Sequence, residues 1–212
     1  MVRQTWEPEI AQLISNMVQK NKNEGRNTPI IVSVVGMPGS GKTTSSGILG
    51  SILQETHEIS CTVLPMDGYH FSIAQLKAME NPEDVIYRRG APDTFDANSL
   101  RKDLSRIRHG DETQVFIPGF DHKIGDPNPN EHVFKRSIHD VVIIEGLYLL
   151  LEKEKFGWTG IKVRRGCIIR QYKYHQLKSL KFILIYIQSC IYRNFLISQY
   201  ILNQILKTVS KD

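Results

Sequence analysis

The chain has 212 residues, of which 41% are hydrophobic and 23% charged, and these values are typical of one globular domain with a sizeable core. Its net charge of +5 is unevenly distributed, because residues 155–211 carry 11 Lys or Arg and no acidic residue, whereas residues 1–154 carry 16 basic and 21 acidic residues. The basic balance therefore gives no ground for nucleic-acid binding by the first 154 residues.

The cysteine pattern and the N-terminal residues both indicate a cytoplasmic protein. Three cysteines lie far apart, without the spacing of a metal or redox site: Cys61, Cys167 and Cys190. Such thiols are typical of the reducing cytosol, and residues 1–7 lack the apolar run of a signal peptide.

Two elements are predicted before residue 36. Apolar side chains recur at helical spacing in residues 6–20, which predicts an amphipathic helix. Residues 21–28 are polar and read as a linker, and residues 29–35 are a short β-branched run typical of a buried parallel strand. We expect residues 1–27 to precede a core that begins at residue 28.

A phosphate-binding loop of the form G-x-x-x-x-G-K-[ST] follows the first strand and reads Gly36-Met37-Pro38-Gly39-Ser40-Gly41-Lys42-Thr43. The glycines allow backbone N–H groups to approach phosphate oxygens, Lys42 reaches the β- and γ-phosphates, and the Thr43 hydroxyl ligates Mg²⁺. Thr44 continues into a predicted helix over residues 44–53, whose positive N-terminus faces the anion. The loop therefore predicts that the chain binds ATP with Mg²⁺.

Residues 61–66 form a second predicted strand, and it ends at Asp67. A kinase must hold an acceptor hydroxyl in line with the γ-phosphorus and take up its proton, and a carboxylate opposite the phosphate loop suits that role. We therefore predict Asp67 and Lys42 as the catalytic residues, with Asp67 as the base. The alternative is a strand-end aspartate that caps a turn.

The next segments carry candidate substrate ligands. A short helix is predicted over residues 72–80, and the adjacent Arg88 and Arg89 either clamp an anionic or polyhydroxyl substrate or form a solvated helix end. A second helix is predicted from Asp96 to its stop at Gly110, residues 114–118 are extended, and residues 120–130 read as a polar loop. His122 in that loop either hydrogen-bonds a substrate or lies on the surface.

Residues 141–144 are a continuous apolar run that predicts another buried strand, ending at Glu145. An acid at this place beside a phosphate loop usually holds Mg²⁺, directly or through water, and the alternative is a solvated strand-end glutamate. Strands that alternate with helices predict a three-layer α/β/α fold with a parallel sheet. Because ligands bind beyond the C-terminal ends of such strands, we expect Gly36, Asp67 and Glu145 to converge on one site.

Four further segments resemble the P-loop kinase family that contains uridine kinase, phosphoribulokinase and bacterial-type pantothenate kinase. They are residues 66–70 (MDGYH), 89–96 (RGAPDTFD), 118–122 (PGFDH) and 144–146 (IEG), and the match runs from about residue 28 to 151. The resemblance implies a P-loop kinase fold with Asp67 as the catalytic base, and it is greatest for the uridine-kinase-like subgroup. It also places five residues around the acceptor: Tyr69, His70, Arg89, Phe95 and His122.

Residues 155–212 depart from the family pattern. Members continue with another strand and an Arg-rich lid, R-x-x-R-D-x-x-x-R-G, that closes on ATP, and no such sequence is present here. Residues 181–187 could supply the missing strand, with Arg193 as the nearest arginine after it. We expect residues 28–154 to form the kinase core. Residues 155–212 are then an atypical basic segment, either an altered product of a gene-model error, retained intron or frameshift, or a genuine tail that contacts an anionic membrane or a partner.

The sequence thus predicts an ATP-dependent small-molecule kinase that transfers the γ-phosphate to a hydroxyl of a nucleoside-, pantothenate- or sugar-like acceptor. The expected partner is that acceptor, without nucleic acid or a membrane, and a homodimer stays open. The alternative is a nucleotide-binding, catalytically impaired kinase-like protein without a functional lid. A switch GTPase is disfavoured, because no aspartate in the chain has a glycine three residues later.

Overall fold

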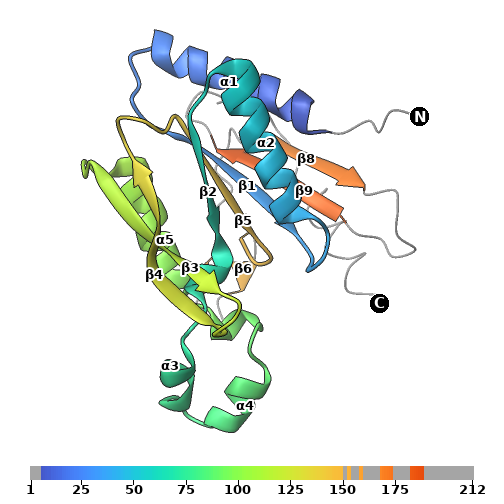
Figure 1. Cartoon of the computed structure of the whole chain (residues 1–212), viewed down its shortest axis with the longest axis vertical. Coiled ribbons are helices and arrows are strands. Elements are labelled where there is room, and N and C mark those ends of the chain that lie inside the picture. Colours follow the sequence, from blue (N-terminus) through green and yellow to red (C-terminus); the bar gives the residue numbers. More distant parts are fainter. Residues whose placement is uncertain (1–5, 150–151, 154–157, 160–167, 174–181, 189–212) are drawn as a thin grey trace.

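The structure, a computed structural model, describes residues 6–149 with their side chains, together with the backbone of four later strands. These strands are β6 (Glu152–Lys153), β7 (Trp158–Thr159), β8 (Ile168–Lys173) and β9 (Phe182–Gln188). The predicted three-layer α/β fold is confirmed: a central sheet has helices α1 and α2 on one face, and helix α5 with the β3–β4 hairpin on the other (Figure 1).

The central sheet has five strands in the order β2-β5-β1-β9-β8. The three predicted strands are β1 (Ile30–Gly36), β2 (Cys61–Pro65) and β5 (Val141–Gly146), and β5 runs parallel to both of its neighbours. Beyond β1 the sheet becomes mixed, because β9 is antiparallel to β1 and β8 is antiparallel to β9. The strand expected over residues 181–187 is therefore present but reversed, an arrangement that needs no helical crossover. Arg193 lies outside the described residues.

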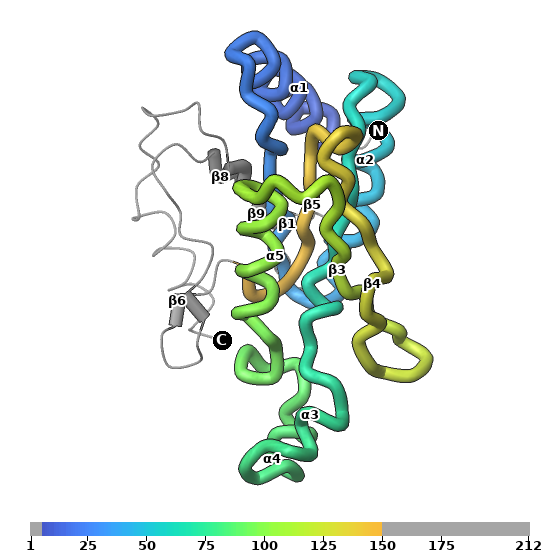
Figure 2. Tube along the Cα trace, turned by 90° about the vertical axis from the view of Figure 1, so that its left-hand side faces the viewer, coloured from blue at the N-terminus to red at the C-terminus, as the bar shows by residue number. Residues whose placement is uncertain are grey.

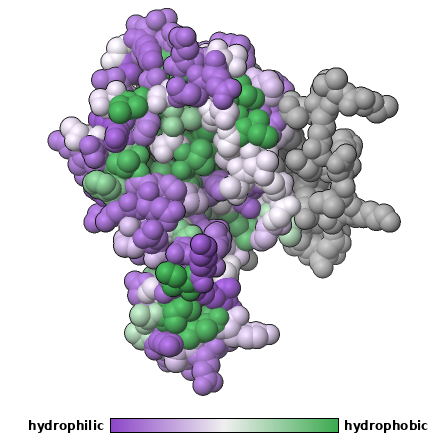
Figure 3. Space-filling view, viewed as in Figure 1, coloured by the Kyte–Doolittle hydropathy of each residue, from purple (hydrophilic) through white to green (hydrophobic). Residues whose placement is uncertain are grey.

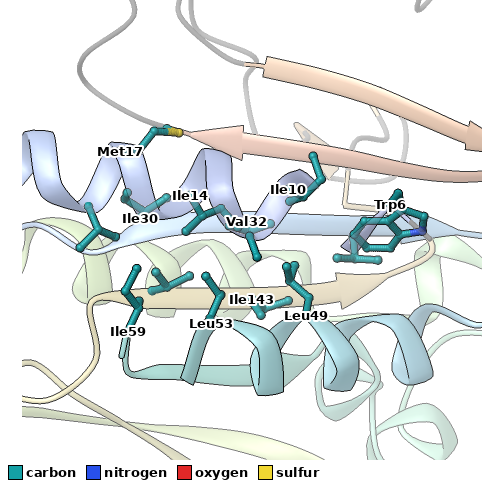
Figure 4. Close-up of a cluster of buried hydrophobic side chains, with 14 residues drawn as sticks. Trp6, Ile10, Ile14, Met17, Ile30, Val32, Leu49, Leu53, Ile59 and Ile143 are labelled. Atoms are coloured by element: carbon teal, nitrogen blue, oxygen red, sulfur yellow. The ribbon is translucent and has the colours of Figure 1, made fainter. Parts of the chain in front are cut away.

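The first covering layer consists of α1 (Glu7–Asn23) and α2 (Lys42–His57). The helix predicted over residues 6–20 is confirmed and extends three residues further. Figure 4 shows its apolar side chains, Ile10 and Ile14 among them, packed with Leu49 and Leu53 of α2 against Val32 and Ile143 of the sheet. The N-terminal helix is thus part of the core that supports the phosphate loop.

The second covering layer contains α5 (Ala97–His109) and a hairpin of β3 (Gln114–Asp121) and β4 (Asp126–Lys135). Helix α5 begins where predicted, because the Asp96 carboxylate accepts a hydrogen bond from the Ser99 N–H at 2.9 Å, and Gly110 ends it. Its apolar face packs with the hairpin on alternate residues of β1, β2 and β5.

The polar loop predicted over residues 120–130 is wrong in extent. Strand β3 continues to Asp121 and β4 begins at Asp126, so only residues 122–125 form the turn. The hairpin is a separate two-stranded sheet whose β4 strand leaves most of its first residues exposed. An exposed edge strand tolerates polar residues and prolines, and for that reason its sequence resembles a loop.

A small lobe projects from the body between β2 and α5 (Figures 1 and 2). It contains α3 (Ile73–Lys77) and α4 (Pro82–Tyr87). The segment η1 (Met66–Tyr69), which packs against β3 and β5, leads into it, and η2 (Pro92–Thr94) follows it. The predicted helix over residues 72–80 is shorter than expected, and a reciprocal capping pair of Ser72 and Gln75 starts it. Helix α4 was not predicted.

The surface of the described part alternates between polar and apolar areas, and apolar residues also reach the surface of the lobe (Figure 3). Among the described helices, none has both the length and the hydrophobicity that crossing a bilayer requires.

Candidate functional site

Three strand ends meet at one edge of the central sheet. In the parallel register, Val35 lies opposite Gly146, and Pro65 lies opposite Glu145. The phosphate loop leaves β1 at this edge, η1 with Asp67 leaves β2, and Glu145 is the second-last residue of β5. The convergence expected from the sequence is therefore present, and it follows from the parallel pairing of β1, β5 and β2.

The phosphate loop turns tightly between β1 and α2. Gly39 and Gly41 have φ values of 68° and 87°, in the left-handed region that glycine occupies without a steric penalty. The Ser40 N–H donates to the Met37 carbonyl at 3.1 Å, and Lys42 Nζ donates to the same carbonyl at 3.1 Å. Glycine at these two positions therefore permits the tight turn that a phosphate-binding loop before a helix requires.

Thr43 in the first turn of α2 and Glu145 near the end of β5 bring two side-chain oxygens together. The Thr43 hydroxyl donates to Glu145 Oε2 at 3.0 Å, and Glu145 is 7% exposed. Burial raises the pKa of Glu145, while the hydrogen bond from Thr43 and the charge of Lys42 act in the opposite direction.

This donor set fits Mg²⁺. Within the described residues there is no group of three or more His, Cys, Asp or Glu side chains that could hold a metal ion. Mg²⁺ is usually held by one or two protein oxygens, with substrate phosphates and water completing its octahedron, and that is the arrangement Thr43 and Glu145 could provide.

Asp67 faces the same charges from η1 while remaining exposed to solvent. Burial lowers the pKa of Lys42, and the carboxylates of Glu145 and Asp67 oppose that shift. The charge of Asp67 also contributes to the raised pKa of Glu145. The charges of Lys42, Asp67 and Glu145 therefore influence one another at this edge of the sheet.

A group of aromatic and imidazole rings lies next to Asp67. The ring centroid of His70 is 3.9 Å from that of Phe95 and 5.0 Å from that of Phe120, and His122 lies 5.1 Å from Phe120. His70 Nδ1 is 2.8 Å from the carbonyl oxygen of Asp67. Burial lowers the pKa of His70, which favours the neutral ring near pH 7. The group offers flat apolar surface and hydrogen-bonding nitrogens close to the proposed base.

Two of the residues predicted to bind the acceptor have hydrogen-bond partners inside the protein. Tyr69 is 4% exposed and its hydroxyl donates to Asp103 of α5 at 3.1 Å. Arg88 binds the Asp93 carboxylate with two hydrogen bonds of 3.0 and 2.9 Å and also pairs with Asp84 at 2.9 Å. The hydroxyl of Tyr69 and the guanidinium of Arg88 are thus already bound within the protein.

Arg89 contacts the ring group through Phe120. Its guanidinium is 5.6 Å from the centroid of Phe120, and it donates to the Phe71 carbonyl at 3.0 Å and to Asp126 at 2.8 Å. It also donates to the Gly125 carbonyl.

Sequence reasoning missed several residues of this region. Phe120 lies within the PGFDH segment but carried no polar signal, and Asp126 fell in the expected loop. Tyr148 follows β5, donates to the Gly90 carbonyl at 2.9 Å and packs edge-on against Phe95 at 5.5 Å. No local pattern distinguishes these side chains, because their positions depend on contacts between distant segments.

Known proteins resemble this chain in sequence. A Schizosaccharomyces pombe protein provisionally named uridine kinase C227.14 is 33% identical over 143 residues, which are 67% of this chain and 59% of that protein. The ATP-dependent kinase YFH7 of Zygosaccharomyces rouxii is 37% identical over 117 residues, which are 44% of this chain and 31% of that protein. The chain therefore spans less than two thirds of the length of these relatives. Profiles of known protein families give no match.

Solved structures share the fold. A kinase assigned to fructose transport in Silicibacter sp. TM1040 has a TM-score of 0.53 and 28% identity, and the match covers 65% of this chain and 64% of that one. The predicted resemblance to the uridine-kinase-like P-loop kinases is confirmed. A D-glycerate 3-kinase of Cryptococcus neoformans, at TM-score 0.51 and 19% identity over 68% of this chain and 53% of that one, shares the fold alone.

Proposed function

We propose that this chain is a kinase that transfers the γ-phosphate of ATP to a hydroxyl of a nucleoside-, pantothenate- or sugar-like acceptor. The observation that carries the proposal is the position of Asp67 directly after β2, at the sheet edge where Pro65 lies opposite Glu145. The charge of Asp67 also acts on the pKa values of Lys42 and Glu145. Relatives named as ATP-dependent kinases support ATP as the donor.

In the proposed reaction the acceptor oxygen forms a bond to the γ-phosphorus while the bond from that phosphorus to the β–γ bridging oxygen breaks. The hydroxyl proton passes to the carboxylate of Asp67, and ADP leaves. Such a base contributes about 10²–10⁴-fold to the rate. Lys42 releases the Met37 carbonyl and pairs with the phosphates, and the loop N–H groups hold the remaining charge.

Mg²⁺ is the implied cofactor, and when bound it neutralises negative charge on the phosphates. Thr43 and Glu145 are the residues that would hold it. Their hydrogen bond of 3.0 Å keeps the two oxygens adjacent, and the rigid ends of β5 and α2 fix their positions.

The proposal is tested with Asp67→Asn, which keeps the shape of the side chain but removes the base. We expect calorimetry to show an unchanged affinity for a non-hydrolysable ATP analogue. Acceptor-dependent ADP release, measured over a panel of nucleosides, pantothenate and sugar acids, is expected to fall about 10²–10⁴-fold. Asp111→Asn, at an exposed position in the loop between α5 and β3, is the matched control and should retain full activity. Equal turnover by Asp67→Asn and wild type would refute the role of the base.

A second candidate function is nucleotide binding without efficient phosphate transfer. It is favoured by the absence of the Arg-rich lid from the sequence, because an arginine that stabilises the migrating phosphoryl group can contribute about 10³–10⁵-fold. If wild type and Asp67→Asn both bind the ATP analogue and neither releases ADP with any acceptor, this second function is the correct one.

A further inference from the structure

We propose that Arg89 and Asp126 form a latch that positions the acceptor side of the site, rather than a clamp that binds the acceptor itself. The proposal rests on the proposed function for its consequence in catalysis, but the latch is a structural claim that can be tested separately. It assigns a positioning role to Asp126, a residue that no sequence motif indicated.

The latch joins three segments that are distant in the sequence. Arg89 Nη2 donates to the Phe71 carbonyl at 3.0 Å and to Asp126 Oδ1 at 2.8 Å, and Arg89 Nη1 donates to the Gly125 carbonyl. The same Asp126 oxygen accepts the Ile73 N–H, at 2.9 Å, at the start of α3. One ion pair therefore ties the α3–α4 lobe to the turn of the β3–β4 hairpin, which are separate features in Figure 1.

These contacts occupy the groups through which Arg89 could bind an anion. The Arg89 side chain is 17% exposed, and its Nε atom is buried with no hydrogen-bond partner in the described part of the chain. A bidentate carboxylate or phosphate clamp needs two N–H groups on one accessible edge of the guanidinium. With both terminal nitrogens bound to protein oxygens and Nε buried, Arg89 lacks such an edge.

The latch contacts the ring group of His70, Phe120 and His122 through Phe120 and through the backbone next to His70. Phe71 follows His70, and the guanidinium is 5.6 Å from the ring centroid of Phe120, which itself packs against His70 and His122. A backbone hydrogen bond also holds the segment next to His70, since the Phe71 N–H donates to the Thr94 carbonyl at 2.9 Å. Loss of the latch should therefore release His70, Phe120 and His122 together, while the phosphate loop on the other side of Asp67 keeps its own supports.

The experiment is hydrogen exchange with mass spectrometry on the full chain, using Asp126→Ala, Arg89→Ala and the double variant. Amide exchange in residues 71–79 and 118–126 should accelerate about tenfold or more in each, because those amides lose a hydrogen bond or the segment that held it. Exchange in residues 36–50 should be unchanged. The double variant should accelerate exchange by less than the product of the two single effects, since the hydrogen bond between Arg89 and Asp126 is lost in both single variants.

Two variants separate positioning from general destabilisation. Asp126→Asn keeps a side-chain oxygen that can accept hydrogen bonds from the Ile73 N–H and from Arg89. Its amides should therefore exchange as slowly as those of wild type. Asp140→Ala is the matched control, because Asp140 is 31% exposed and pairs with Lys22 at 3.0 Å, much as Asp126 is 30% exposed and pairs with Arg89. It should leave residues 71–79 and 118–126 unchanged. Uniform acceleration along the chain, or no acceleration in the two segments, would overturn the latch.

Kinetics then test its consequence for catalysis. With an acceptor that the panel identifies, Asp126→Ala should raise the acceptor KM about tenfold, while the KM for ATP stays within about twofold. A chain that shows the expected exchange pattern but binds no ATP analogue would retain the latch and refute the proposed kinase, so the two failures are distinguishable. An ATP-binding chain without the exchange pattern would refute the latch alone.

Discussion

The close approach of η1 to strand β3 at Gly68 gives a prediction whose magnitude follows from the structure. A Cβ atom on Gly68 would lie 2.1 Å from the carbonyl oxygen and 2.5 Å from the carbonyl carbon of Pro118, both backbone atoms. Because neither segment can rotate a side chain away, Gly68→Ala forces η1 and β3 apart. Overpacking of this kind costs about 1–3 kcal/mol.

The net effect is smaller, because alanine restricts the unfolded chain and offsets about 0.4–1 kcal/mol. We therefore expect Gly68→Ala to lower the free energy of unfolding by about 1–2 kcal/mol. With a urea m-value of about 1–3 kcal/mol/M, this shifts the unfolding midpoint down by about 0.3–2 M. Circular dichroism in a urea titration measures that midpoint.

Gly47 provides the matched control. It lies on the exposed side of α2, and a Cβ atom there would meet nothing within 4 Å. Gly47→Ala should therefore raise the free energy of unfolding by about 0.5–1 kcal/mol, since glycine is a poor helix former. The two identical substitutions thus have opposite expected signs. If Gly68→Ala unfolds at the wild-type midpoint or above it, the tight contact with Pro118 is refuted.

Displacing η1 should also affect catalysis, because Gly68 is adjacent to Asp67. A misplacement of about 1 Å can cost about 10²-fold in rate. Acceptor-dependent ADP release by Gly68→Ala should fall by a comparable factor, whereas its affinity for an ATP analogue should remain that of wild type.

Three further predictions concern buried side chains. Tyr69→Phe should lower the free energy of unfolding by about 1 kcal/mol, measured in urea, and leave ADP release unchanged, because the lost hydrogen bond goes to Asp103 of α5. Ile14→Ala should cost about 2–5 kcal/mol if α1 belongs to the core, and a loss below about 1 kcal/mol would contradict that placement. Burial lowers the pKa of His70, so the folded protein binds a proton on this ring less readily than the unfolded chain does. The stability that neutral His70 contributes is therefore fully present above its ordinary pKa of 6.5 and is lost as the pH falls through its folded pKa. Between about pH 7.5 and about pH 5, the free energy of unfolding should therefore fall less for His70→Gln than for wild type, as measured by urea titrations.

Much of the site could be predicted from local sequence. The phosphate loop, the strands before and after it, and the acids at strand ends are short-range patterns, since each depends on residues within one turn or one strand. The parallel order of β1, β5 and β2 then brings Thr43 and Glu145 together at 3.0 Å, although 102 positions separate them. That convergence was predictable because parallel strands end at the same edge of a sheet.

The sequence by itself determined the phosphate loop, the three-layer α/β fold and the family resemblance, because periodicity and motif spacing are properties of consecutive residues. Only the tertiary structure decided the partners of individual polar side chains. Tyr69 bonds to Asp103, Arg89 bonds to Asp126, and β9 pairs antiparallel with β1. Polar groups that become buried need hydrogen-bond partners, and they bond to those that the packed segments bring close. Those choices depend on segments that are far apart in the chain, and no local pattern records them.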